Sequence, residues 1–246
     1  MSDPLRIFIG YDSKEPVAFH VLAHSILRRA TGPVAILPLV QSALRARGLY
    51  ERERGPTEAT EFSMTRFLVP FLCGYQGRAV FMDCDMVARV DLWSLMVDPY
   101  VSVSVCQHDY TPAENIKMDG QTQTSYPRKN WSSFMVFNNS ECRRLTPDYI
   151  NVATGLDLHR FNWLNDSQIG SLPLEWNWLV GEYKANPDAK VLHYTNGGPW
   201  FRDYTNCDHA AEWYAEYLHM TQPQIATTTA ATTRVMGGTR REFVGA

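Results

Sequence analysis

Ala79-Val-Phe-Met-Asp-Cys-Asp85 joins four consecutive apolar residues to two carboxylates that flank a cysteine. A short, continuous apolar run of this kind is typical of a strand that is buried on both faces of a sheet. On an extended strand the two carboxylates would point to opposite faces, so both can reach one cation only if the chain turns at Cys84. The strand is therefore expected to end at this acidic pair.

The segments around this stretch alternate between strand-like and helix-like patterns. Further strands are predicted at 6–10, 34–39 and 101–106, and helices over 16–30 and 63–72. This alternation favours an α/β fold with a mainly parallel central sheet that is flanked by helices on both faces. Ligands bind such sheets at the carboxyl ends of the strands, which is where Asp12 and the acidic pair lie.

Length, composition and charge exclude several classes of protein. The 246 residues are 45% hydrophobic, which is enough for one large domain with a substantial core. The net charge of −3 supplies no positive field for nucleic acid, so nucleic acid is not an expected partner. The first apolar run, at 7–9, is too short for a signal sequence or a membrane span. We expect a cytoplasmic protein without stable membrane insertion.

Cysteine usage and local composition indicate the compartment and the domain boundary. The five cysteines form no CxxC pair, and their odd number excludes complete intramolecular pairing, which favours a reducing compartment. The charged stretch 45–61 mixes basic with acidic residues and is interpreted as a solvated excursion. Residues 221–246 are rich in threonine and small residues, so we expect a flexible tail after one domain over 1–220.

The acidic pair and a downstream histidine predict a metal site. Two hard oxygen ligands such as Asp83 and Asp85 suit Mg²⁺ or Mn²⁺ bound together with a diphosphate. His193 ends a short apolar strand just before the Gly197-Gly198 turn, and an imidazole ligand favours Mn²⁺ over Mg²⁺. The backbone N–H groups of a glycine turn can approach an anion. For the acidic pair alone, an ordinary acidic turn at a strand end is the alternative.

In chain order, these motifs resemble those of retaining GT-A glycosyltransferases related to glycosyltransferase family 8. The resemblance covers residues 6 to about 205 and rests on Asp12, Thr65-Arg-Phe67, Asp83-Cys-Asp85, Asp166-Ser-Gln168, and His193 with Gly197-Gly-Pro-Trp200. It implies a Rossmann-like GT-A domain with a nucleotide-sugar-binding half over about 1–105 and an acceptor half over about 106–220. It also implies a metal-dependent hexosyltransferase that uses Mn²⁺ or Mg²⁺ and a nucleotide-sugar donor, with a UDP-hexose expected.

The resemblance assigns donor binding to residues of the first half. Gly10, Tyr11 and Asp12 match the loop that receives the base and ribose, and the Asp12 carboxylate could accept from a uracil N–H. Arg66 matches an arginine that contacts the donor's phosphate or sugar. A planar, permanently charged guanidinium is well suited to that contact.

One position departs from the family's pattern. The family commonly has a lysine just before Pro-Trp that binds phosphate, whereas this chain has Gly198 there. The backbone amides of Gly197 and Gly198 could bind the diphosphate alone, or Arg202 could replace the missing charge. The departure bears on the identity of the donor sugar more than on the fold.

The resemblance also indicates which residues act on the sugar. The three predicted metal-ligating residues match the metal ligands of the family, and Arg66 would stabilise the departing diphosphate together with the ion. Asn138 lies in a segment that resembles an asparagine-containing strand near the donor sugar. Asp166 and Gln168 match an acidic-amide pair on the reacting side of the sugar, and either is a candidate nucleophile if a covalent intermediate forms.

Several functions stay open at this point. A glycan, a lipid-linked sugar or another hydroxyl compound is the expected acceptor, with a protein or a modified nucleobase in phage DNA as alternatives. A nucleotidyltransferase also uses paired carboxylates and Mg²⁺, but the glycine-rich, lysine-containing loop it normally has near the N-terminus is missing here. A catalytically silent, sugar-binding homologue is the alternative from outside the enzymes.

Overall fold

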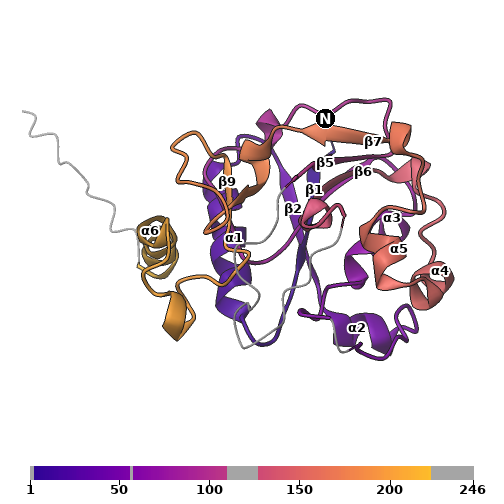
Figure 1. The fold of residues 1–246 in the computed structure, drawn as a ribbon, viewed down its shortest axis with the longest axis horizontal. Helices are drawn as coiled ribbons and strands as arrows, with labels where there is room; N and C mark the ends of the chain where they lie inside the picture. Colours follow the sequence, from indigo (N-terminus) through magenta and orange to yellow (C-terminus); the bar gives the residue numbers. More distant parts are fainter. Residues whose placement is uncertain (1–2, 56–57, 110–126, 223–246) are drawn as a thin grey trace, which may run out of the picture.

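In the computed structural model, which describes residues 3–55, 58–109 and 127–222, a six-stranded sheet forms the centre of the molecule (Figure 1). Its strand order is β2-β1-β3-β6-β5-β7. The bounds are Leu5–Gly10 for β1, Val34–Leu39 for β2, Arg78–Met82 for β3, Val103–Cys106 for β5, Phe134–Asn138 for β6 and Ile169–Leu172 for β7. β6 is antiparallel to both of its neighbours, whereas the other neighbouring pairs are parallel. The predicted mainly parallel sheet is confirmed.

Helices lie on both sides of this sheet (Figure 1). On one side α1 (Pro16–Arg29) packs against α6 (Ala210–Thr221), and on the other lie α2 (Gln41–Ala46), α3 (Val69–Leu72), α4 (Pro147–Val152) and α5 (Gly155–His159). The single helix predicted over 63–72 is instead a 3₁₀ turn, η1 (Thr65–Leu68), followed by α3. Pro70 stands in the first turn of α3 and has no N–H to continue the helical hydrogen bonds of η1.

A smaller, three-stranded sheet with the order β4-β9-β8 was not predicted as a unit. It contains β4 (Met86–Ala88), β8 (Trp178–Leu179) and β9 (Val191–His193). β4 follows β3 after a turn, so the chain passes directly from the large sheet into the small one. Because β4 pairs antiparallel with β9, Met86 lies opposite His193. This pairing brings two distant parts of the sequence to one place.

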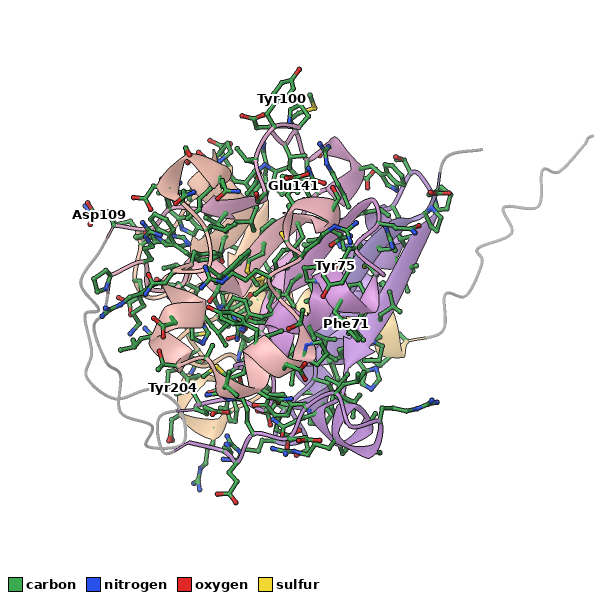
Figure 2. All side chains as sticks on the ribbon, turned by 90° about the vertical axis from the view of Figure 1, so that its right-hand side faces the viewer. Phe71, Tyr75, Tyr100, Asp109, Glu141 and Tyr204 are labelled. Atoms are coloured by element: carbon green, nitrogen blue, oxygen red, sulfur yellow. The ribbon has the colours of Figure 1, made fainter. Side chains whose placement is uncertain are left out.

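The core lies between the large sheet and its helices. Side chains of β3 from Ala79 to Met82 are at most 1% exposed, which confirms that this apolar run is covered on both faces. Apolar burial on this scale is the main stabilising contribution to folding. Tyr100, by contrast, is 93% exposed and projects from the surface (Figure 2).

Part of the charged stretch 45–61 is not a solvated excursion. Nη1 of Arg52 donates to the carbonyls of Ile150 at 2.8 Å and Ala153 at 2.5 Å, at the end of α4. Arg45 donates to the carbonyl of Arg52 and lies 4.9 Å from the centre of the Tyr50 ring. The last backbone carbonyls of a helix have no partner within the helix, and Arg52 donates hydrogen bonds to two of these carbonyls. The stretch is therefore fastened to α4.

The remaining features of the fold are its C-terminal segment and the length of its helices. The tail predicted over 221–246 lies outside the described residues from 223 onward, and α6 itself extends to Thr221. Among the described helices, not one combines the length and the apolar character that crossing a membrane requires.

Candidate metal and donor site

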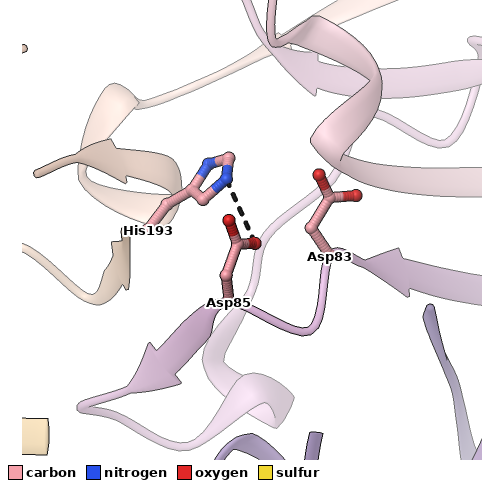
Figure 3. Close-up of side chains that lie close together, drawn as sticks. All are labelled: Asp83, Asp85 and His193. Carbon is pink, nitrogen blue, oxygen red and sulfur yellow. Dashed lines mark ion pairs between the residues drawn. The ribbon is translucent and has the colours of Figure 1, made fainter. Parts of the chain in front are cut away.

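The predicted metal ligands meet where the two sheets join (Figure 3). Asp83 directly follows β3, the chain turns at Cys84 as predicted, and Asp85 directly precedes β4. His193 ends β9, which is the neighbour of β4. One ligand atom from each of Asp83, Asp85 and His193 lies within 4.8 Å of the other two. The three residues that the sequence singled out are therefore brought together.

Backbone hydrogen bonds hold the two acidic residues in place. The N–H of Asp83 donates to the carbonyl of Ser133 at 2.9 Å, and the carbonyl of Asp85 accepts from the N–H of Tyr194, also at 2.9 Å. Both aspartates thus belong to a hydrogen-bonded frame that continues the two sheets. A rigid frame of this kind lets the carboxylates face one point without a further ordering cost when a ligand binds.

His193 is buried and its two ring nitrogens face different partners. Nδ1 lies 2.8 Å from Oδ1 of Asn177, and Nε2 lies 3.3 Å from Oδ1 of Asp85. The side chain of His193 is 2% exposed and that of Asp85 is 10% exposed. The edge of the ring that carries Nε2 is therefore the one directed at the carboxylates (Figure 3).

Arg66 forms the cationic wall of the site. Its Nη1 lies 2.8 Å from Oδ1 of Asp83 and donates to the carbonyl of Ser132 at 2.8 Å. The guanidinium packs over the rings of Phe62 and Phe81, with centroid distances of 5.3 and 5.0 Å. Its side chain is only 6% exposed, so aromatic packing and hydrogen bonds fix one orientation.

The three residues and Arg66 line a cavity of about 150 Å³. Its wall also contains Glu58, Ala59, Thr60, Ser63, Met64, Asn130, Ser132, Ser133, His159 and Thr195. Burial, together with the nearby charges of Arg66 and Arg52, lowers the pKa of His159 to about 3, so this histidine is neutral. Its Nδ1 lies 2.7 Å from Oγ of Ser132. The cavity is thus walled mainly by polar groups around the acidic pair.

Glu15 is a buried acidic residue near the site that the sequence did not reveal. Burial, followed by the charges of Asp85 and Asp12, raises the pKa of the Glu15 carboxyl to about 9. Its Oε2 accepts a hydrogen bond from Nε1 of Trp200 at 3.1 Å. In the sequence, Glu15 is visible only as the residue before a predicted helix, because its partners Trp200 and Asp85 lie far away along the chain.

The donor set suits a divalent cation. Two carboxylates and one imidazole at this spacing match the oxygen and nitrogen ligands that Mn²⁺ accepts, with room for further ligands from phosphate. Burial, followed by the charges of Glu15, Asp85 and Asp83, raises the pKa of Cys84 well above its usual range. The thiol between the aspartates therefore stays protonated and is a poor ligand.

The predicted base-binding loop lies at the same edge of the sheet as Asp83. β1 and β3 are parallel, with Ile9 opposite Met82, so Gly10 ends β1 beside the acidic pair. A Cβ at Gly10 would come within 2.3 Å of the Phe62 ring, which explains why glycine is needed there. Asp12 is buried, and its two oxygens accept the N–H groups of Lys14 at 2.9 Å and Glu61 at 3.1 Å.

The glycine turn is used for packing. The N–H of Gly197 donates to the carbonyl of Tyr194 at 2.8 Å, so this amide is already engaged. A Cβ at Gly198 would lie 2.0 Å from the Trp200 ring, so only glycine allows this close approach. Arg202 is exposed in η8 (Arg202–Tyr204) and does not line the cavity. Gly198 thus has a packing role, and the phosphate binding expected of the two glycines stays a prediction.

Three predicted sugar-contacting residues lie away from the cavity. Asn138 pairs with Arg78 at the start of β3, because β6 runs antiparallel and ends at the opposite edge from Asp83. Asp166 and Gln168 precede β7, whose first residue pairs with the first residue of β5, at that same opposite edge. Asp166 is 84% exposed and lies 2.6 Å from Arg128, and Gln168 donates to Oγ of Ser102 at 3.2 Å. The structure does not bring these three residues together with the candidate metal ligands.

Further residues that line or support the site were not predicted from the sequence. Asn130, Ser132 and Ser133 precede β6 and line the cavity, and Asn177 contacts His193 from behind. The pair Ser132-Ser133 at the start of an apolar strand was the available signal for the first group. Asn177 gave no such signal, because its role depends on a contact between two segments.

The arrangement of sheets and helices is that of the GT-A glycosyltransferases. The solved structure of the bifunctional glycosyltransferase WbbM matches 88% of this chain and 52% of its own, with a TM-score of 0.58 and 17% identity. The match to GlyE of Streptococcus pneumoniae covers 88% of this chain and 61% of GlyE, with a TM-score of 0.57 and 14% identity. The galactosyltransferase LgtC was solved in complex with donor and acceptor sugar analogues. Its match covers 89% of this chain and 98% of LgtC, with a TM-score of 0.57 and 12% identity.

These likenesses define the fold, and sequence identity defines the family. The chain spans about half of WbbM and 61% of GlyE. No protein-family model matches the chain. Protein CDI of Arabidopsis thaliana is 48% identical over 222 residues, which are 87% of this chain and 86% of that protein. The chain belongs to the same family as Protein CDI.

Proposed function

We propose that this protein is a metal-dependent glycosyltransferase that moves a hexose from a UDP-sugar to a hydroxyl acceptor, with retention of configuration. The observation that carries the proposal is the meeting of Asp83, Asp85 and His193 within 4.8 Å of one another at the edge of a GT-A fold. Arg66 adds a fixed positive charge 2.8 Å from Asp83. Opposite charges so arranged suit a diphosphate that is bound through a cation.

The residues divide the work of binding the donor. Asp83, Asp85 and His193 would hold the ion, and the loop after β1, with Tyr11 and Asp12, would receive the base and ribose. A divalent ion there neutralises the negative charge that develops on the diphosphate as the bond to the sugar breaks. The guanidinium of Arg66 is held in place by the rings of Phe62 and Phe81, so its positive charge faces the site in a fixed orientation.

The transfer step requires little acid-base chemistry from the protein. The bond between C1 of the sugar and the diphosphate oxygen breaks, and its electron pair leaves with the diphosphate. The acceptor oxygen bonds to C1 from the same side, and its proton passes to a phosphate oxygen of the leaving group. Neutral His159 and Ser132 line the cavity and could hold the sugar hydroxyls by hydrogen bonds. Glycans and lipid-linked sugars are the acceptors we propose first.

Nucleotide release from a panel of UDP-, GDP-, ADP- and CMP-sugars tests the proposal. The panel is run with Mn²⁺ and with EDTA, on the wild type, on Asp85→Asn and on the exposed control Asp98→Asn. We expect release from a UDP-sugar that EDTA abolishes and that Asp85→Asn lowers by about 100-fold or more. Asp98→Asn should change it less than about twofold, because surface substitutions usually have little effect.

Two results would contradict the proposal. Unchanged release in EDTA and in Asp85→Asn would show that the acidic pair holds no catalytic metal. Absence of release from every donor, together with no thermal stabilisation by nucleotide and Mn²⁺, would favour a sugar-binding homologue without catalysis.

A further inference from the structure

Asn177 lies directly behind His193 and is completely buried. Its Oδ1 lies 2.8 Å from Nδ1 of His193. Its Nδ2 donates to Oγ of Ser133 at 2.8 Å and lies 3.0 Å from Nε2 of His108 and 3.4 Å from the carbonyl oxygen of Asn130. One amide therefore joins the candidate metal ligand to three other polar groups.

The neighbours of Asn177 allow only one orientation of its amide. A carbonyl oxygen can only accept, so the side of the amide that faces the carbonyl of Asn130 must be the NH₂ group. Oγ of Ser133 already donates to the same carbonyl at 2.7 Å, so it too must accept from Asn177. The amide oxygen is then left facing His193. Nδ1 of His193 must carry a proton in order to donate to it.

His108 strengthens this arrangement from the other side. Because Nε2 of His108 accepts from Asn177, its proton is on Nδ1, which lies 2.9 Å from the hydroxyl of Tyr183. Burial lowers the pKa of His108 to about 3, so it stays neutral and keeps its acceptor. The chain of hydrogen bonds thus runs from Tyr183 through His108 and Asn177 to His193.

We propose that Asn177 is a positioning residue that fixes the proton of His193 on Nδ1 and so presents the lone pair of Nε2 to a divalent cation. Nε2 is the nitrogen that lies 3.3 Å from Asp85. Hydrogen bonds to the outer nitrogen of a metal-binding histidine fix its tautomer and raise its basicity. The inference rests on the proposed function for the role of the metal, but the placement of the proton is a property of the protein alone.

The first measurement concerns the metal-free protein. In ¹⁵N NMR spectra of the histidine rings, Nδ1 of His193 should carry a slowly exchanging proton in the wild type. Asn177→Ala should lose that protection, because the acceptor is gone. An Nδ1 of His193 without a proton in the wild type would overturn the proposal, whatever the protein's activity.

The second measurement is the dissociation constant for Mn²⁺ in the absence of nucleotide. The electron paramagnetic resonance signal of the unbound ion reports how much Mn²⁺ is free. Asn177→Ala should weaken binding by about 10- to 100-fold. His108→Leu, which removes the acceptor for the amide, should weaken it in the same direction. His108→Gln can keep an acceptor for the amide, so its affinity should lie close to that of the wild type. Tyr183→Phe, at the far end of the chain of hydrogen bonds, should change the affinity less than about threefold.

The outcomes separate this inference from the proposed function. Wild-type affinity for Mn²⁺ in Asn177→Ala, with the ring proton still protected, would contradict the positioning role. If the wild type itself binds no Mn²⁺, the metal site fails, while the ring-proton measurement still decides where the proton of His193 lies. Should Asn177→Ala not fold, the comparison of His108→Leu with His108→Gln tests the same hydrogen-bond chain.

Discussion

Glu15 adds a third acidic side chain to the surroundings of Asp85. Its side chain is buried, and burial together with the charges of Asp85 and Asp12 raises the pKa of Glu15 to about 9. At neutral pH and without metal, Glu15 is therefore a neutral acid. It accepts from Nε1 of Trp200, which ties the start of α1 to the turn after β9.

Replacing Glu15 by glutamine should change how stability depends on pH. The folded pKa, about 9, lies above the usual value of 4.5, so the stability of the metal-free wild type is complete below about pH 4.5 and falls as the pH rises toward 9. Glutamine stays neutral and can still accept from Trp200. In EDTA, Glu15→Gln should raise the melting temperature over the wild type by about 5 °C or more at pH 8 and much less at pH 5. An equal difference at both pH values would contradict the assignment.

At this scale, residue type and strand position predicted which three residues form the candidate metal site, but no local feature predicted the residues that support them. Asp83, Asp85 and His193 are recognisable because each ligand type stands at the end of an apolar run. Glu15 and Asn177 act through partners 185 and 16 residues away along the chain, Trp200 and His193. Such contacts exist only once the two sheets have formed, so a single sequence cannot display them.

Helices α1 and α6 are held together through one buried carboxylate. Glu216 of α6 accepts from Arg28 at 2.8 Å, from Arg29 at 2.9 Å and lies 2.6 Å from Nδ1 of His24, all on α1. Burial would raise the pKa of Glu216, but the hydrogen bonds from Arg28 and Arg29 outweigh it and lower the pKa to about 2. On α6, the rings of Trp213 and Tyr217 stack on each other with their centroids 5.5 Å apart.

Replacing Glu216 by glutamine should loosen this helix pair. The folded pKa lies below the usual value of 4.5, so the contribution to stability is present above about pH 4.5 and is lost as the pH falls toward 2. Glu216→Gln should cost about 2–3 kcal/mol at pH 7, because the two arginines lose their charged partner. Urea unfolding at pH 7 and pH 3 checks this. A cost that is no smaller at pH 3 would contradict the role of the charge.

At the scale of elements, the apolar runs and their spacing predicted four strands of the large sheet (β1, β2, β3 and β5) and the first helix, but they did not predict strand direction. Nothing in the apolar run 134–138 says that β6 is antiparallel, yet this direction moves Asn138 to the edge opposite Asp83. Similarly, the charges of the stretch 45–61 indicated solvent, whereas Arg52 binds carbonyls at the end of α4. Both outcomes depend on partners that lie far away in the chain.

On the scale of the whole molecule, the candidate site occupies the junction of the two sheets (Figure 3). Asp83 follows a strand of the six-stranded sheet, and Asp85 precedes a strand of the three-stranded one. A ligand that binds there contacts both sheets and stabilises their relative placement by mass action. Strand and helix alternation predicted the mainly parallel large sheet from four of its strands. Of the small sheet, the sequence indicated only the strand that ends at His193, because strands of two and three residues are too short for a periodic signal.

We propose that this junction binds a nucleoside diphosphate through a divalent cation. Calorimetric titration of UDP into the wild type, first with Mn²⁺ and then with EDTA, tests it most directly, with Asp85→Asn as the matched variant. We predict binding in Mn²⁺, loss of binding in EDTA, and loss of binding in Asp85→Asn under both conditions. Binding of UDP that is equally strong in EDTA and in Asp85→Asn would show that no metal at the acidic pair holds the diphosphate.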